Sequence, residues 1–336
     1  MKAVAYQKAG PITSPEALVD IELDAPIAEG HDLLVRVQAV SVNPVDTKIR
    51  KNVSPENNQW KTLGWDAVGI VEAIGDKVSQ FKIGDIVWYA GAINRQGSNS
   101  ELQLVDERIV GHKPKTLEAT EAAALPLTAI TAWEMLFDRL QVPKDTPENT
   151  TILVIGGAGG VGSITIQLLK QLTNLTIIAT ASRAETQDWV KQLGADYVLD
   201  HRQPLAAQIK QLGLTAPLYV FSTTQTDRHL ADIVELIAPQ GRFGLIDDPE
   251  QLDIKPFKTK SVSVHWEFMF TRSMFQTEDM AKQSELLNEV GKLVDEGKVK
   301  TTVTEVISPI NAKNLKRVHQ QIESGTTKGK IVLQGF

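Results

Sequence analysis

The chain has 336 residues, a length that accommodates two domains of ordinary size. Its composition is that of a globular protein, with 42% hydrophobic and 23% charged residues. The net charge of −6 at pH 7 argues against the basic surface of a protein that binds nucleic acid or anionic membranes. The chain contains no cysteine, which excludes disulfides, thiolate nucleophiles and cysteine-held zinc or iron–sulfur sites.

The sequence also predicts a protein that does not insert into membranes. No segment reaches the roughly 18 apolar residues of a membrane span. The first residues, MKAVAYQKAG, lack the apolar core of a signal peptide. Together with the absence of cysteine, this favours a cytoplasmic protein whose partner is a small molecule, with neither nucleic acid nor membrane among its partners.

The first third of the chain is typical of compact antiparallel β structure. Glycines interrupt short segments that are rich in valine and isoleucine. We expect strands at residues 2–7, 33–42, 67–74 and 85–89. Helical spacing follows at residues 118–125 and 128–140, with Pro126 between the two segments.

From residue 151 onward, apolar segments alternate with helical ones. We expect strands at residues 151–155, 176–181, 197–199, 218–221, 241–246 and 261–266, and helices at 161–172, 185–193 and 230–237. This alternation predicts a parallel sheet that is covered by helices on both faces. The remaining segments predict helices at 279–296 and 311–324 and strands at 301–307 and 330–333.

A glycine-rich motif directly follows the strand expected at residues 151–155. Gly157, Gly159 and Gly162 form a G-x-G-x-x-G pattern, with Gly160 and Val161 inside it, and the pattern opens a helix. Gly157 would permit a tight turn, Gly159 would let the backbone approach a pyrophosphate, and Gly162 would let the helix pack on the sheet. The first amides of the helix would face the phosphates. The motif therefore predicts a Rossmann domain that binds a dinucleotide.

The end of the second strand of this domain indicates which dinucleotide is bound. NAD sites usually have an acidic residue there, but this chain reads Thr180-Ala181-Ser182-Arg183. Arg183 can form charge-assisted hydrogen bonds with a 2′-phosphate, and Ser182 can donate one more. The sequence therefore favours NADPH. The alternative is that Arg183 is an ordinary solvated residue at the start of a helix.

With these motifs, the chain resembles the medium-chain dehydrogenase/reductase superfamily, specifically its quinone oxidoreductase branch and the subgroup labelled zinc-binding alcohol dehydrogenase-like. The resemblance covers essentially the whole chain. Besides the glycine motif, it is carried by SVNPVD at 41–46, GWDAVG at 64–69, GDIV at 84–87, ALPLT at 124–128 and GAD at 194–196.

The resemblance implies an α/β fold in which a Rossmann doubly wound parallel sheet is inserted in a GroES-like mainly-β domain. The GroES-like catalytic domain would comprise residues 1–125 plus 270–336. The Rossmann dinucleotide-binding domain would comprise residues 126–269.

The resemblance also indicates that no metal is bound. Zinc enzymes of this superfamily have a cysteine ligand where this chain has Asn43, a histidine ligand where it has Trp65, and a third ligand near Leu127. The expected zinc ligands are thus absent, and the six histidines show no ligand spacing.

The expected catalytic residues are Asn43, Asp46 and Tyr89. The resemblance places Asn43 and Asp46 beside the nicotinamide, where the Asn43 amide could donate a hydrogen bond. Tyr89 could donate or relay a proton. Each has a structural alternative: Asn43 as a turn residue before Pro44, Tyr89 as a packing residue, and Asp46 as a buried hydrogen-bond acceptor.

Further cofactor contacts are expected from residues at strand ends and near the C-terminus. The resemblance implies this role for Thr128, Ser222, Thr223, Leu245, Ile246, Trp266, Phe268 and Lys330. The aromatic segment 266–270 could form the wall of an apolar substrate pocket. Alternatively, it could cover the interface of a homodimer, which is the assembly we expect.

Without a metal ion, the protein has no strong Lewis acid with which to polarise a simple ketone. Acceptors that stabilise the added negative charge are therefore favoured, such as quinones or α,β-unsaturated carbonyls. The sequence predicts an NADPH-dependent, zinc-independent reductase of such acceptors. The alternatives are a metal-free alcohol or carbonyl dehydrogenase and a non-catalytic NADPH-binding regulator.

Overall fold

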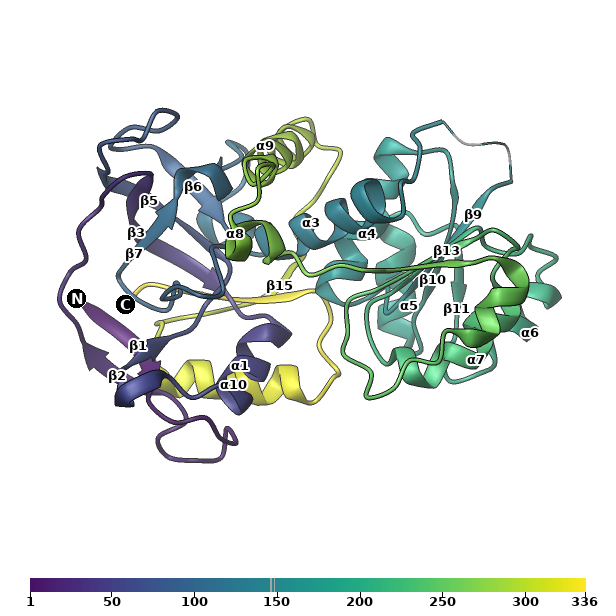
Figure 1. Cartoon of the computed structure of the whole chain (residues 1–336), viewed down its shortest axis with the longest axis horizontal. Helices are drawn as coiled ribbons and strands as arrows, with labels where there is room; N and C mark the ends of the chain where they lie inside the picture. Colours follow the sequence, from purple (N-terminus) through teal and green to yellow (C-terminus); the bar gives the residue numbers. More distant parts are fainter. Residues whose placement is uncertain (146, 148) are drawn as a thin grey trace. The chain divides into compact units, whose positions relative to one another are not determined.

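A computed structural model describes residues 1–145, 147 and 149–336. They form two compact units, one made of Met1–Ile130 and Phe270–Phe336 and the other of Thr131–Met269 (Figure 1). The second unit is thus inserted in the chain of the first. The sequence analysis places the first boundary a few residues earlier, after residue 125. None of the described helices is long and apolar enough to span a bilayer.

The first unit is mainly β, as the sequence predicts. Its strands are β1 (Lys2–Tyr6), β2 (Val19–Glu22), β3 (Asp32–Ser41), β4 (Lys61–Thr62), β5 (Ala67–Ile74), β6 (Ile86–Tyr89), β7 (Leu102–Asp106), β8 (Val110–His112), β15 (Val303–Ile307) and β16 (Lys330–Gln334). They form a three-stranded sheet, β2-β1-β4, and a seven-stranded sheet, β15-β16-β3-β5-β6-β8, in which β7 also pairs with β3.

The helices of this unit are short, apart from two near the C-terminus. They are α1 (Pro44–Asn52), η1 (Glu56–Asn58), η2 (Glu107–Ile109), α2 (Ala119–Ala122), α8 (Thr271–Phe275), α9 (Lys282–Asp295) and α10 (Ala312–Glu323). The chain passes into the second unit within α3 (Pro126–Trp133).

Strand β3 brings distant parts of the chain together. It pairs antiparallel with β5 and β7 along its length, and its last residues pair with β16. In this register Val40 lies opposite both Ala67 and Leu333. The residues that follow β3 therefore lie beside the segment that precedes β5 and beside the start of β16.

The second unit contains a six-stranded parallel sheet with the order β11-β10-β9-β12-β13-β14. The strands are β9 (Thr151–Ile155), β10 (Thr176–Thr180), β11 (Tyr197–Leu199), β12 (Tyr219–Ser222), β13 (Arg242–Leu245) and β14 (Ser263–Trp266). The helices are η3 (Glu134–Arg139), α4 (Gly160–Leu172), α5 (Ala184–Gln192), α6 (Leu205–Gln211), α7 (Thr226–Leu236) and η4 (Lys255–Lys260).

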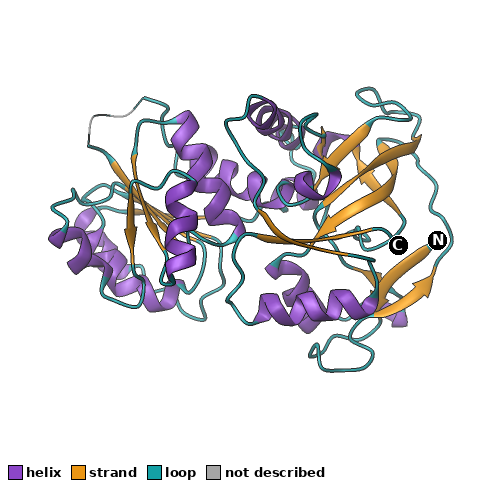
Figure 2. Cartoon of the chain, turned by 180° about the vertical axis from the view of Figure 1, so that it is seen from behind, coloured by secondary structure: helices purple, strands orange, loops and turns teal. Residues whose placement is uncertain are grey.

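This strand order confirms the predicted Rossmann fold. The chain starts in the middle of the sheet at β9, proceeds to β11, and then crosses to β12 on the other side of β9. Figure 2 shows helices on both sides of these strands. Every residue of β9 is buried, as the apolar run at 151–155 predicts for a strand covered on both faces.

Some elements differ from the sequence prediction. Helix α1 starts at Pro44, where the sequence suggests a turn; proline at the first helical position has its φ angle already set for a helix. The single helix expected at 128–140 is divided into α3 and the π-helical segment η3. Strands β2, β4, β7 and β8 were not predicted.

A buried pair of carboxyl groups lies in the second unit. Glu134 in η3 and Glu267 after β14 are 0% and 4% exposed. Arg139 is ion-paired with Glu267, with Nε 2.8 Å from Oε2. Burial raises the pKa of Glu267, and the nearby Glu134 raises it further.

The raised pKa of Glu267 predicts a stability that falls with increasing pH. The folded chain binds this proton more tightly than the unfolded chain, so stability is lost as pH rises from about 4.3, the ordinary pKa of glutamate, through the higher pKa of the folded state. Glu267→Gln should therefore raise the thermal midpoint at pH 9 and leave it little changed near pH 5.

The matched control is Glu250→Gln, which alters an exposed glutamate of the same unit. Its midpoint should follow the wild-type profile from pH 5 to 9. If the thermal midpoints of the wild type and of Glu267→Gln changed with pH in the same way, the raised pKa of Glu267 would be contradicted.

Candidate functional site

The glycine motif forms the turn between β9 and α4. The left-handed residue of this turn is Gly156, with φ +81°, and not Gly157, to which the sequence analysis assigned the tight turn. A side chain at Gly156 would collide with the Thr223 hydroxyl, at 2.3 Å from the added Cβ. Gly157 packs against β10 instead, because its Cβ would lie 3.0 Å from that of Ala179.

Gly162 and Gly159 have different surroundings. A Cβ on Gly162 would lie 2.3 Å from the carbonyl oxygen of Gly156, so only glycine lets α4 approach the turn this closely. A Cβ on Gly159 would meet only that same oxygen, at 3.5 Å, which is ordinary van der Waals contact. Gly159 is also the N-cap of α4, followed by Gly160 and Val161, and the first amides of a helix have no partner within it. The turn thus offers the arrangement that binds phosphate groups.

Two arginines lie near the carboxyl ends of β10 and β11. Arg183 is the N-cap residue of α5, and it is exposed and ion-paired with Glu185. Arg202 follows β11, donates to the carbonyl oxygen of Ser182 at 2.8 Å, and forms a bidentate pair with Asp200. This contact places Arg202 next to the Ser182–Arg183 segment.

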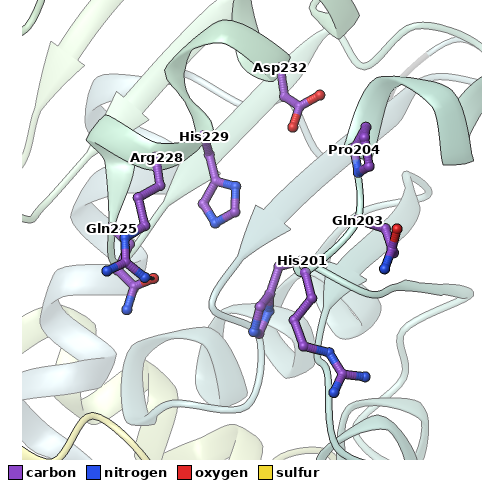
Figure 3. Close-up of a pocket in the computed structure, with 8 residues that line it drawn as sticks. His201, Gln203, Pro204, Gln225, Arg228, His229 and Asp232 are labelled. Atoms are coloured by element: carbon purple, nitrogen blue, oxygen red, sulfur yellow. Dashed lines mark hydrogen bonds between the residues drawn. The ribbon is translucent and has the colours of Figure 1, made fainter.

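A cavity of about 530 Å³ lies next to this arginine pair, on the side of α6 and α7. Apart from Pro204, its lining residues are polar: His201, Arg202, Gln203, Gln225, Arg228, His229 and Asp232. Figure 3 shows the two imidazoles side by side, with ring centroids 6.3 Å apart. Burial lowers the pKa of both histidines, which favours their neutral forms near neutral pH.

The other cofactor contacts expected in this unit lie at the carboxyl ends of β12, β13 and β14. The hydroxyl of Ser222 bonds with that of Thr226, which in turn bonds with Asp247. Thr223 donates from its hydroxyl to the carbonyl of Ile155, at 2.8 Å. Leu245 is buried and Ile246 is half-buried.

Trp266 and Phe268 lie at and just after the end of β14, the edge strand of the sheet. They are 51% and 47% exposed. This exposure is compatible with either role that the sequence leaves open for the aromatic segment.

In the first unit, a buried polar cluster forms where β3, β5 and β16 meet. Lys330 Nζ donates to Asp66 Oδ2 at 3.0 Å, to the carbonyl oxygen of Val42 at 3.1 Å, and to Asn43 Oδ1. The Asn43 amide donates back to Asp66 Oδ2 at 2.8 Å. The side chains of Asn43 and Asp66 are 0% exposed and that of Lys330 is 4% exposed. Burial raises the pKa of Asp66, and the Lys330 ammonium opposes this shift.

Asp46 lies beside this cluster in the first turn of α1. Its Oδ2 accepts from the backbone N–H of Asn43 at 2.7 Å, and the backbone N–H of Gly64 also interacts with this carboxyl group. Burial raises the pKa of Asp46 to about 7 against the lowering effect of the Asn43 N–H. Asp46 can therefore hold or release a proton near neutral pH.

The structure brings together Asn43, Asp46 and Lys330, but the hydroxyl of Tyr89 bonds elsewhere. Tyr89 is fully buried in β6 and donates to Gln103 Oε1 at 2.9 Å. Burial raises the pKa of its phenol. Thr128 is also buried, and its hydroxyl donates to the carbonyl of Leu125.

The residues that this chain has at the zinc-ligand positions of related enzymes are not suited to bind a metal ion. The Trp65 indole is buried and donates to the carbonyl of Ala92 at 3.2 Å, and the Leu127 backbone N–H donates to Asp66 Oδ1. The Asn43 amide is bonded to Lys330 and Asp66. Across the described ranges, no three His, Asp or Glu side chains are grouped as metal ligands.

Sequence reasoning missed three residues that the structure adds to the site. His201 and Arg202 directly follow a predicted strand, and the carboxyl ends of neighbouring parallel strands share one edge of a sheet. That rule could have placed them beside Arg183. The pairing of Asp66 with Lys330 joins residues 264 positions apart, for which the sequence holds no local signal.

Two protein families match this chain. The family described as an alcohol dehydrogenase GroES-like domain matches residues 29–116, and the family described as a zinc-binding dehydrogenase matches residues 193–333. The first match lies within the GroES-like part, and the second begins in the Rossmann part and continues past residue 269 into the second GroES-like segment.

Similar proteins cover nearly the whole chain. A zinc-type alcohol dehydrogenase-like protein of Staphylococcus epidermidis is 40% identical over 99% of both chains. A mitochondrial NAD(P)H oxidoreductase of Danio rerio is 30% identical over 90% of this chain and 83% of its own length. The crystal structure of a putative zinc-dependent alcohol dehydrogenase from Rhizobium etli is 60% identical, with a TM-score of 0.97 over 100% of this chain and 98% of that one.

Proposed function

Since the chain belongs to the zinc-type alcohol dehydrogenase-like proteins of the medium-chain dehydrogenase/reductase superfamily, we propose that it is a reductase that works without zinc. It transfers a hydride from NADPH to a quinone or to an α,β-unsaturated carbonyl compound. The activities named for its relatives, including the NAD(P)H oxidoreductase of Danio rerio, support the oxidoreductase class.

The proposed type of acceptor follows from the residues at the zinc-ligand positions. At the positions where zinc-dependent relatives place metal ligands, this chain has an amide bound to a lysine, a buried indole and a leucine. No side chain there can act as, or hold, a strong Lewis acid that polarises a simple ketone or ionises an alcohol. A quinone accepts a hydride without such help, because the resulting hydroquinone anion is stabilised by resonance. An enone gives an enolate for the same reason.

The glycine turn and the two arginines support NADPH as the hydride donor. The first amides of α4 would bind a pyrophosphate, and Arg202 contacts the carbonyl oxygen of Ser182, the residue before Arg183, at neighbouring strand ends. Two guanidinium groups match the charge of a 2′-phosphate, which NADH lacks. The adjoining polar cavity with His201 and His229 would receive the adenosine end of the cofactor.

A pair of alanine substitutions tests whether the glycine turn binds the cofactor. Gly159→Ala adds a Cβ that the protein tolerates, so the thermal midpoint should not change. The added methyl group would keep the pyrophosphate from the backbone, and the dissociation constant for NADPH should rise at least about tenfold. Isothermal titration calorimetry measures this constant.

Gly162→Ala is the comparison variant, because its added Cβ would collide with the carbonyl oxygen of Gly156. This substitution should lower both the thermal midpoint and the affinity for NADPH. If Gly159→Ala binds NADPH as tightly as the wild type, the pyrophosphate does not lie on this turn.

Substituting the two arginines tests the preference for NADPH. Arg183→Ala and Arg202→Ala each remove charge-assisted hydrogen bonds to the 2′-phosphate, so the dissociation constant for NADPH should rise by about 10- to 100-fold. The constant for NADH should stay nearly unchanged. Lys191→Ala, which removes an exposed cation from the same helix α5, is the control and should affect neither cofactor. Equal losses for NADPH and NADH would refute the 2′-phosphate site.

The proposed reaction is tested by following NADPH oxidation with three acceptors. An ortho-quinone and an α,β-unsaturated ketone are compared with a saturated ketone of similar size. We expect turnover with one or both of the activated acceptors and none with the saturated ketone. Turnover of the saturated ketone would support a carbonyl dehydrogenase instead, and tight NADPH binding without any turnover would support a regulator.

A further inference from the structure

The environment of the Lys330 ammonium is that of a bound cation. Three oxygen atoms converge on Nζ: a carboxylate oxygen of Asp66, the amide oxygen of Asn43 and the carbonyl oxygen of Val42. An ammonium has three hydrogens, and this set of acceptors uses all of them. A buried charge requires such pairing, because leaving it without partners costs several kcal/mol.

The backbone fixes the lysine in this place. Gly329 has φ +55°, and a Cβ on it would lie 2.3 Å from the carbonyl oxygen of Thr302, so a side chain is excluded immediately before Lys330. The backbone N–H of Lys330 donates to that same Thr302 carbonyl at 2.9 Å. From this point β16 runs antiparallel to the end of β3, with Val332 opposite Ser41. The position of the ammonium is therefore set by the start of β16.

The Lys330 ammonium lies beside residues at or next to the zinc-ligand positions of related enzymes. Asn43 stands where zinc enzymes of the superfamily have a cysteine ligand, and Asp66 follows Trp65, which stands where they have a histidine ligand. Asn43 and Asp66 now hold an ammonium of the chain itself. We propose that Lys330 is the resident cation of this site and takes the place of a metal ion, so the positive charge is built into the sequence.

This assignment explains how the cluster is organised. The Lys330 ammonium donates to the amide oxygen of Asn43, and the amide nitrogen of Asn43 donates to Asp66. These two hydrogen bonds determine which way the Asn43 amide is turned. A divalent ion at this point would face the ammonium within bonding distance of the same oxygens, and like charges at such separation repel strongly. The site therefore excludes metals by occupation and by charge, as well as by its lack of sulfur and imidazole ligands.

The test is a double-substitution cycle combined with metal analysis. Lys330→Met removes the charge and keeps the length of the side chain, Asp66→Asn removes the carboxylate, and the double variant removes both. Lys313→Met, which alters an exposed lysine on α10, is the control. Urea unfolding is followed for each variant. The zinc content of the purified wild type is measured after dialysis against excess zinc and then against metal-free buffer.

We expect each single variant to lose about 100-fold or more in the ratio of folded to unfolded protein, because each leaves one buried charge without its partner. The double variant should recover most of the loss, the control should match the wild type, and the wild type should retain far less than one zinc per chain.

Recovery in the double variant supports the proposal even if Lys330→Met alone does not fold. A double variant that fails to fold, or whose loss equals the sum of the single losses, would overturn it. Retention of one zinc per chain by the wild type, lost in Asn43→Ala, would also overturn it. Both measurements are independent of the acceptor, so the proposed reaction could fail while this assignment stands.

Discussion

The buried ion pair between Lys330 and Asp66 joins three distant parts of the first unit. Asn43 and Val42 follow β3, Asp66 precedes β5, and Lys330 begins β16. Removing two charges from water is unfavourable unless both are fully paired, and here the carboxylate also accepts from the Leu127 N–H at 2.7 Å. The sheet positions of β3, β5 and β16 and the polar cluster therefore depend on one another. The same pairing fixes the Lys330 ammonium beside the Asp66 carboxylate.

The second unit is governed by a steric constraint. Helix α4 packs so closely on the turn after β9 that a Cβ at position 162 would lie 2.3 Å from the carbonyl oxygen of Gly156, so this position requires glycine. The parallel strands then place their carboxyl ends along one edge, where Arg202 bonds to the carbonyl oxygen of Ser182, the residue before Arg183. A turn of this kind, at the carboxyl ends of parallel strands, is the feature with which Rossmann folds bind a dinucleotide.

Much of this architecture could be predicted from the sequence, because its signals are local. The alternating pattern at 67–74 predicts β5 with its observed bounds, and the apolar run at 151–155 does the same for β9. The glycine motif predicts the turn, although the left-handed residue is Gly156. Helix α1 was missed because Asn43-Pro44 fits both a turn and a helix start. The partners of the site residues could not be predicted, since Lys330 meets Asn43 and Asp66 only through the pairing of β16 with β3.

The central claim is that this protein transfers a hydride to its acceptor without zinc. The most direct measurement compares NADPH oxidation by an ortho-quinone in protein treated with a strong chelator, in untreated protein, and in chelated protein resupplied with zinc. Our account predicts equal rates in all three. A rate that is lost on chelation and restored by zinc would contradict it.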